Sequence, residues 1–108
     1  MNKSPDILAR VTSHLYEFFS NNIPTNLYFH NLKHTQEVVE AVKEIGIHEG
    51  LSDEEIEPLT IAAWFHDTGY CCKYKGHEDK SINLARTFLE EQEYPQNLID
   101  IVVSCIDA

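Results

Sequence analysis

The sequence predicts an all-α fold, a compact bundle of about five helices. Only four glycines and four prolines interrupt its 108 residues, and no alternating apolar and polar run of useful length predicts a strand. Apolar residues instead recur at the spacing of amphipathic helices, with the glycines and prolines between these segments. With 43% hydrophobic residues, the chain is suited to a single domain over residues 1–108, with one core.

The first two helices are delimited by caps and prolines. Ser4 is a candidate N-cap and Pro5 a first helical residue, and the helix is predicted to end before Pro24. Its apolar stripe consists of Leu8, Val11, Leu15, Phe18 and Phe19. A second helix is predicted over residues 31–50, where the final glycine suits a left-handed cap, or over 31–46 if the earlier glycine ends it.

The third helix has a capping signature at its start. Ser52 and Glu55 have capping-box spacing, and the helix is predicted to reach about Asp67, just before a glycine. Pro58 either kinks this helix or separates a short first turn from the rest. The segment TGYCCKYKG at residues 68–76 is predicted to be a loop.

Two further helices complete the predicted bundle. The fourth is predicted over residues 77–92, and Pro95 restarts the chain as a fifth. The apolar side of the fifth helix consists of Leu98, Ile101, Val102 and Cys105. Because this helix stops at Ala108 without a cap, we expect the parent protein to continue and the C-terminal part of the domain to be missing.

Composition narrows the class of protein. Eighteen acidic against eight basic residues give a formal charge of −10, which repels nucleic-acid polymers and anionic membranes. No apolar stretch of about 18 residues and no secretory signal is present. The three cysteines form neither a paired framework nor a C-x-x-C motif. We expect a cytoplasmic protein whose thiols are buried or without a function.

Three of the six histidines are predicted to lie at one end of a helical apolar stripe. They are His34 (with Val38, Ala41 and Ile45), His66 (with Leu59, Ala62 and Ala63) and His77 (with Ser81, Leu84 and Phe88). A lone histidine on an apolar face is more often a hydrogen-bonded core residue than a ligand. Three in one short chain, with Asp67 beside His66, favour a metal site, since imidazole and carboxylate are common transition-metal ligands. We predict that His34, His66 and Asp67 bind a divalent metal ion.

Other histidines, lysines and aromatic residues are expected to lie around the predicted metal ligands or on the surface. His30 lies four residues before His34, the spacing at which two imidazoles approach one site on a helix, and we expect it near the substrate. His14 and His48 have polar neighbours and are predicted to lie on the surface. Three lysines follow the His-Asp doublet and either bind phosphate or are simply solvated: Lys73, Lys75 and Lys80. Three aromatic residues are predicted to form core and pocket wall: Trp64, Phe65 and Tyr70.

The strings YFHNLKHTQEVVEAV, IAAWFHDTGY and GHEDKSINLARTFL carry a family resemblance. Over roughly residues 28–108 the chain resembles the HD-domain superfamily of metal-dependent phosphohydrolases, particularly its small bacterial branch. The resemblance implies an HD-type helical domain in which His34, His66 and Asp67 are metal ligands. It also implies that His77 and Glu78 lie beside the metal, as contacts to a second metal or to the substrate phosphate.

The family's closing ligand is an aspartate on a later helix, and the sequence stops before that point. Asp100 and Asp107 are the only late aspartates; Asp107 is misplaced for the role and Asp100 is expected to face solvent. We therefore expect an incomplete, three-ligand site in these residues.

The resemblance implies hydrolysis of a phosphate monoester or diester in a small molecule, foremost a nucleotide. Asp67, His77 and Glu78 would be the catalytic residues, and the divalent ion could be Mn, Fe, Mg, Zn or Ni. Two alternatives stay open: a catalytically inert HD module that senses a ligand or mediates association, and oxygen-dependent chemistry on a di-iron centre. A homodimer is also compatible with the sequence.

Overall fold

The computed structural model describes residues 7–22, 25–66, 68 and 77–107, without the side chains of residues 22, 25–31 and 77–78. These residues form five helices and no strand: α1 (Ile7–Asn22), α2 (Thr25–His48), α3 (Asp53–Phe65), α4 (His77–Glu91) and α5 (Gln96–Asp107). The predicted all-α bundle of about five helices is confirmed. None of the described helices is long and apolar enough to cross a bilayer.

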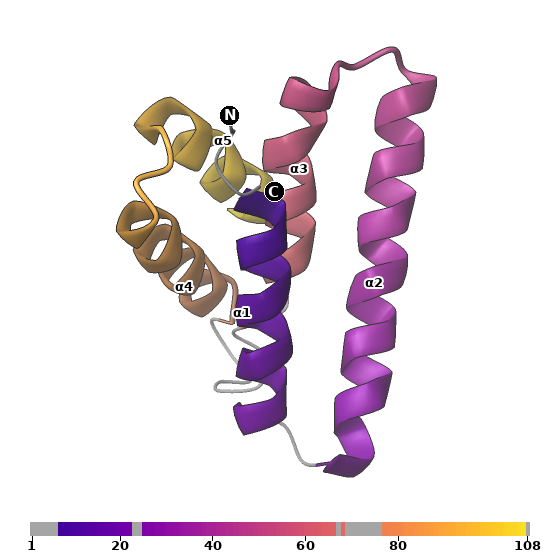
Figure 1. Ribbon diagram of the computed structural model, residues 1–108, viewed down its shortest axis with the longest axis vertical. Helices are drawn as coiled ribbons and strands as arrows, with labels where there is room; N and C mark the ends of the chain where they lie inside the picture. Colours follow the sequence, from indigo (N-terminus) through magenta and orange to yellow (C-terminus); the bar gives the residue numbers. More distant parts are fainter. Residues whose placement is uncertain (1–6, 23–24, 67, 69–76, 108) are drawn as a thin grey trace.

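Helix α3 occupies the centre of the bundle and packs against all four other helices (Figure 1). Most of its residues are buried, from Ile56 to Phe65. A helix that is apolar on nearly every side needs partners on every side, and α1, α2, α4 and α5 supply them. The C-terminal end of α3, where His66 follows the helix, is thereby packed against the surrounding helices.

Helix α1 buries the stripe that the sequence predicts. Val11, Leu15 and Phe19 are almost fully buried, while Leu8 and Phe18 lie half-buried at the edge of the core. The predicted cap and first residue, Ser4 and Pro5, lie outside the described residues, as does Pro24.

Helix α2 begins earlier than predicted and presents a different face. It starts at Thr25 rather than near Asn31, because asparagine inside a helix costs only about 0.7 kcal/mol relative to alanine, too little to end one. Among its described side chains, those of Leu32, Thr35 and Val39 are buried. Of the face expected to point inward, Val38 packs half-buried against the core, whereas His34, Ala41 and Ile45 are exposed, so the prediction was wrong for these three residues.

Two glycines shape the connection from α2 to α3. Helix α2 runs through Gly46, where an added Cβ would lie 2.8 Å from Ile56 Cγ1, so this glycine permits close packing of α2 on α3. Gly50 has φ +82°, and the amides of Gly50 and Leu51 donate to the carbonyls of Ile47 and Gly46. This is a Schellman cap, and it confirms the left-handed cap predicted at Gly50.

The capping box of α3 is present as predicted. Ser52 Oγ accepts from the Glu55 amide at 3.1 Å, and Glu55 Oε1 accepts from the Ser52 amide at 2.8 Å. Pro58 lies inside the helix and does not split it, although its ring removes one backbone donor. The helix ends at Phe65 with His66 as C-cap, slightly before the predicted end.

Helix α4 also ends in a Schellman cap, in which a glutamate, Glu93, occupies the position that glycine favours. The amides of Glu93 and Tyr94 donate to the carbonyls of Glu90 and Leu89, the Schellman pattern again. Glu93 has φ 60°, a left-handed conformation that costs residues with a Cβ about 1 kcal/mol or more.

Replacing Glu93 with glycine is expected to raise the free energy of unfolding by about 0.5 to 1 kcal/mol, because glycine adopts positive φ without a Cβ clash. Urea denaturation measures this change. Glu93→Gln is the control, since it removes the charge and keeps the Cβ. An equal gain in both variants would assign the effect to charge instead of conformation.

Helix α5 turns a different side to the core than predicted. Ile99, Val102 and Ile106 are buried, whereas Ile101 is 41% exposed and Cys105 is also exposed. Val102 is the one residue of the predicted apolar side that is fully buried. Apolar residues occupy adjacent positions along α5, so the sequence pattern supports either of two inward faces. The backbone of Pro95 accepts from the amides of Leu98 and Ile99, so α5 begins directly after this proline.

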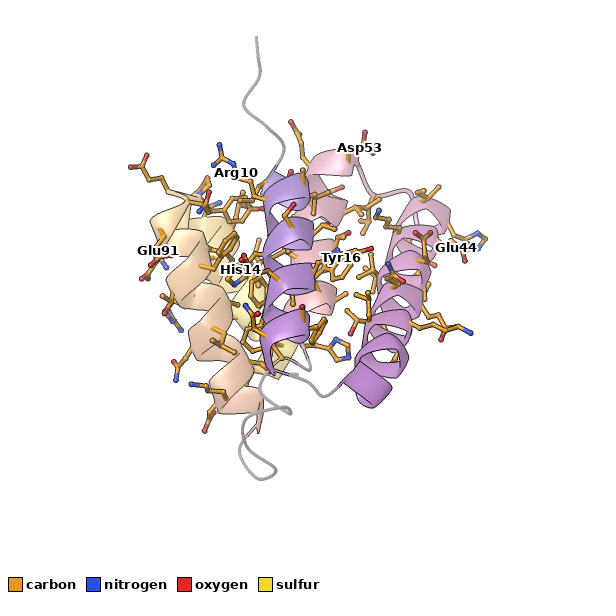
Figure 2. The ribbon with its side chains drawn as sticks, turned by 60° about the horizontal axis from the view of Figure 1, so that its bottom comes forward. Arg10, His14, Tyr16, Glu44, Asp53 and Glu91 are labelled. Carbon is orange, nitrogen blue, oxygen red and sulfur yellow. The ribbon has the colours of Figure 1, made fainter. Side chains whose placement is uncertain are left out.

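His14 is partly buried, although a surface position was predicted. Its ring lies on α1 (Figure 2), stacks on Phe88 of α4 with centroids 4.2 Å apart, and has its centroid 6.1 Å from that of Phe65. Burial lowers the pKa of His14, and Glu17 and Glu91 partly oppose that shift. The polar sequence neighbours of His14 do not reveal this environment, because its aromatic partners come from α3 and α4.

This buried imidazole predicts a loss of stability in acid. The lowered pKa in the folded state means that the unfolded chain binds the proton more readily, so stability falls as pH drops below about 6.5. In His14→Phe, which keeps an aromatic ring, the melting temperature is expected to fall less steeply between about pH 7.5 and 5. If the melting temperatures of the original protein and of His14→Phe fall equally with pH, the prediction is contradicted.

Candidate metal centre

The structure brings together two of the predicted metal ligands. The rings of His34 on α2 and His66 at the end of α3 have centroids 6.0 Å apart and an interplanar angle of 49°. Two imidazoles that share one ion through bonds of about 2.1 Å, at octahedral to trigonal angles, have ring centroids roughly 4.6 to 5.6 Å apart. The observed separation is a few tenths of an ångström wider than this range, and both side chains are accessible, since His34 is exposed and His66 half-buried.

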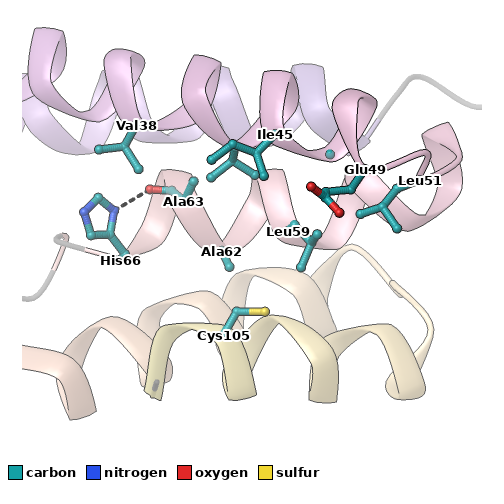
Figure 3. A pocket seen from close by; sticks show the side chains of 11 residues that line it. Val38, Ile45, Glu49, Leu51, Leu59, Ala62, Ala63, His66 and Cys105 are labelled. Atoms are coloured by element: carbon teal, nitrogen blue, oxygen red, sulfur yellow. Dashed lines mark hydrogen bonds between the residues drawn. The ribbon is translucent and has the colours of Figure 1, made fainter.

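A hydrogen bond selects the tautomer of His66. Its Nδ1 lies 2.6 Å from the carbonyl oxygen of Ala63, one turn back on α3 (Figure 3). Because a carbonyl oxygen only accepts, Nδ1 carries the proton, which leaves the lone pair of the neutral imidazole on Nε2. Metal-binding histidines commonly have this arrangement, in which the second nitrogen donates to a carbonyl and orients the ring.

Side-chain hydroxyls satisfy two more carbonyls at this end of α3. Thr68 donates to the Phe65 carbonyl at 2.8 Å, and Ser81 of α4 donates to the His66 carbonyl at 3.1 Å. Both hydroxyl residues are buried, so the backbone that carries His66 is held by α3 and α4 together. The C-terminal end of a helix is also the negative end of its dipole, which favours a cation there.

The remaining predicted site residues are only partly described. Asp67, Lys73 and Lys75 lie outside the described residues, as does Tyr70. His77 and Glu78 form the first turn of α4, and His30 lies in α2 one turn before His34 instead of preceding the helix; their side chains are not described. Lys80 is exposed in the first turn of α4.

Among the described residues, no group of three or more His, Cys, Asp or Glu side chains is placed to hold a metal ion. The third predicted ligand, Asp67, is not among them. Asp100 is exposed and accepts from Gln96 Nε2 at 3.0 Å, and Asp107 is exposed near the end of α5. Both aspartates face solvent within this part of the chain, as expected for Asp100.

The sequence interpretation missed an apolar groove that ends at His66. The α2–α3 groove has a volume of about 390 Å³, and α2 and α3 contribute most of its lining: Val38, Val42, Ile45, Leu59, Ala62 and Ala63. His66 lies at one end, Glu49 and Leu51 at the other, and Cys105 of α5 lies opposite α2 (Figure 3). The helical spacing of Val38 and Ile45 was the available signal, and both were assigned to the core-facing stripe of His34 and Ala41.

Comparisons of the chain with known protein families, with curated proteins and with solved structures find no match.

Proposed function

We propose that the protein is an HD-type metal-dependent phosphohydrolase that acts on a phosphate ester of a small molecule, foremost a nucleotide. The observation that carries the proposal is the pair of imidazoles from different helices, His34 and His66, whose separation is close to that of two ligands of one ion. The sequence places Asp67, a carboxylate, directly after His66.

The chemistry of these donors fits a divalent transition metal. His34, His66 and Asp67 would hold the ion, with two neutral nitrogens and one carboxylate. When bound, such an ion acts as a Lewis acid and makes water more acidic. The Ala63 carbonyl supports this role, because it retains the proton on Nδ1 of His66 and thereby fixes which nitrogen points away from α3.

The chain's own residues would bind and orient the ester. In the proposal, Asp67 orients water or accepts its proton, and His77 and Glu78 contact the phosphate from the start of α4. Lys80, one turn along α4 from His77, would offset phosphate charge, together with Lys73 and Lys75. The positive N-terminal end of the α4 dipole would favour the same anion.

The test is an activity screen combined with elemental analysis of the purified protein. We expect bound transition metal and hydrolysis of p-nitrophenyl phosphate or bis-p-nitrophenyl phosphate. Asp67→Ala is expected to lose both metal and turnover, whereas Asp107→Ala, an exposed aspartate on α5, is expected to keep both.

Other outcomes of these measurements would favour a different function or remove the proposed site. Bound metal without turnover on any ester would favour a catalytically inert ligand-sensing or interaction module. Activity that disappears only under strict anaerobiosis would favour oxygen-dependent chemistry. Unchanged turnover in Asp67→Ala would remove the assignment of the site.

A further inference from the structure

The α2–α3 groove is an open apolar surface that the proposed hydrolysis does not use along most of its length. Ile45 lines the groove and is 62% exposed. Cys105 also borders a second shallow depression on α5, lined by Asp100, Ile101 and Ser104. Apolar surface thus continues from α2 across to α5. Contiguous exposed apolar surface on a small domain is typical of an interaction site.

The length and course of the groove suit an α-helix. Its lining on α2 extends from Val38 to Glu49, a rise of about 17 Å at 1.5 Å per residue. Helices α2 and α3 run side by side along this length and form its two walls (Figure 3). A helix of about three turns would contact both walls through residues at i, i+3 or i+4, and i+7.

The charge around the groove favours a basic partner. Glu49 lines its far end, and no hydrogen bond or ion pair to this carboxylate is found among the described side chains. Asp100 borders the continuation on α5. Lys43 lies on another face of α2, beside Glu40 and Thr12. The whole chain carries a formal charge of −10, so a second copy would bring repulsive charge to this surface.

We propose that the α2–α3 groove binds an amphipathic helix of a partner protein, with apolar residues facing the groove and lysine or arginine on its flanks. One basic flank meets Glu49, and the apolar side covers Ile45 and the wall formed by Ala62 and Ala63. The groove shares His66, at one of its ends, with the proposed metal site, but the residues on which the helix proposal rests, Ile45 and Glu49, are not among the predicted ligands.

The chain offers a matched pair of variants for the test. Ile45 and Ile47 are both exposed isoleucines on α2, at 62% and 69%, but only Ile45 lines the groove. The probe is a fluorescein-labelled helical peptide of about four turns, with leucine at i, i+3 and i+7 and lysine on both flanks. A twin peptide has glutamate in place of each lysine. Fluorescence anisotropy gives the dissociation constants.

We expect the lysine peptide to bind and Ile45→Ser to weaken binding about tenfold, since a buried isoleucine is lost. Ile47→Ser is expected to leave affinity unchanged, and the glutamate peptide to bind at least about tenfold more weakly. Glu49→Gln should reduce both the affinity and its dependence on salt.

Several results would overturn the proposal. These are no binding of the lysine peptide at millimolar concentration, equal affinity for both peptides, or equal effects of the two isoleucine variants. A homodimer in sedimentation equilibrium that Ile45→Ser dissociates would make a second copy the occupant. If a longer form of the polypeptide fails to bind a peptide that the 108-residue chain binds, the polypeptide itself covers the groove.

Discussion

Replacing His66 with alanine is expected to lower the affinity for a divalent metal ion by at least about 100-fold. Residues that merely support a ligand typically contribute about 10- to 100-fold to metal affinity, and His66 is a proposed direct ligand. The 2.6 Å hydrogen bond to the Ala63 carbonyl holds the His66 ring in one orientation. The alanine variant loses this oriented nitrogen ligand. Competition with a chromophoric chelator for Zn²⁺ measures the affinity.

His34→Ala is expected to cause a comparable loss, because its ring lies 6.0 Å from that of His66. His48→Ala is the matched control, since His48 is an exposed histidine at the other end of the same helix, α2. Circular dichroism should confirm that all three variants stay helical. If His48→Ala weakens binding as much as His34→Ala, the ion is bound by scattered surface groups and not at the proposed site.

The largest loss of stability is expected for Phe65→Ala, at about 3 to 5 kcal/mol. Phe65 is only 1% exposed and lies at the end of α3, with the rings of His14 and Phe88 both 6.1 Å away. Removing it leaves a cavity where α1, α3 and α4 meet. Since a domain is commonly stable by only about 5 to 15 kcal/mol, this variant should be close to unfolded at ambient temperature.

Urea denaturation followed through the fluorescence of buried Trp64 reports this loss. Phe18→Ala is the control, because Phe18 lies only half-buried against the core and should lose clearly less stability. A change below about 1 kcal/mol in Phe65→Ala would mean that neighbouring side chains collapse into the space, contrary to a rigid junction of the three helices.

Local chemistry explains which parts of the fold were predictable. The Ser52–Glu55 capping box and the left-handed Gly50 depend on residues within a few positions of each other, and both are present. The helix phases of α2 and α5 depend on distant partners. In α2, adjacent Val38 and Val39 support two alternative inward faces, and packing on α1 and α3 buries Val39 and leaves Val38 half-buried.

The candidate site divides in the same way. The sequence brought His34 and His66 together through their stripes and the family resemblance, and their rings do lie close to each other. The stripe argument was nevertheless wrong about direction, since His34 is exposed. The acceptor of the His66 proton, the Ala63 carbonyl, was not foreseeable, because side-chain patterns carry no information about backbone acceptors.

The central position of α3 determines how the domain should respond to local opening. Beyond its exposed first turn, most of α3 is buried among four other helices, so exchange of these amide hydrogens with solvent deuterium should require nearly complete unfolding. The amides of α3 would then report the global stability of the chain. A ligand held at His66 would slow their exchange together, even in turns far from the bound atom.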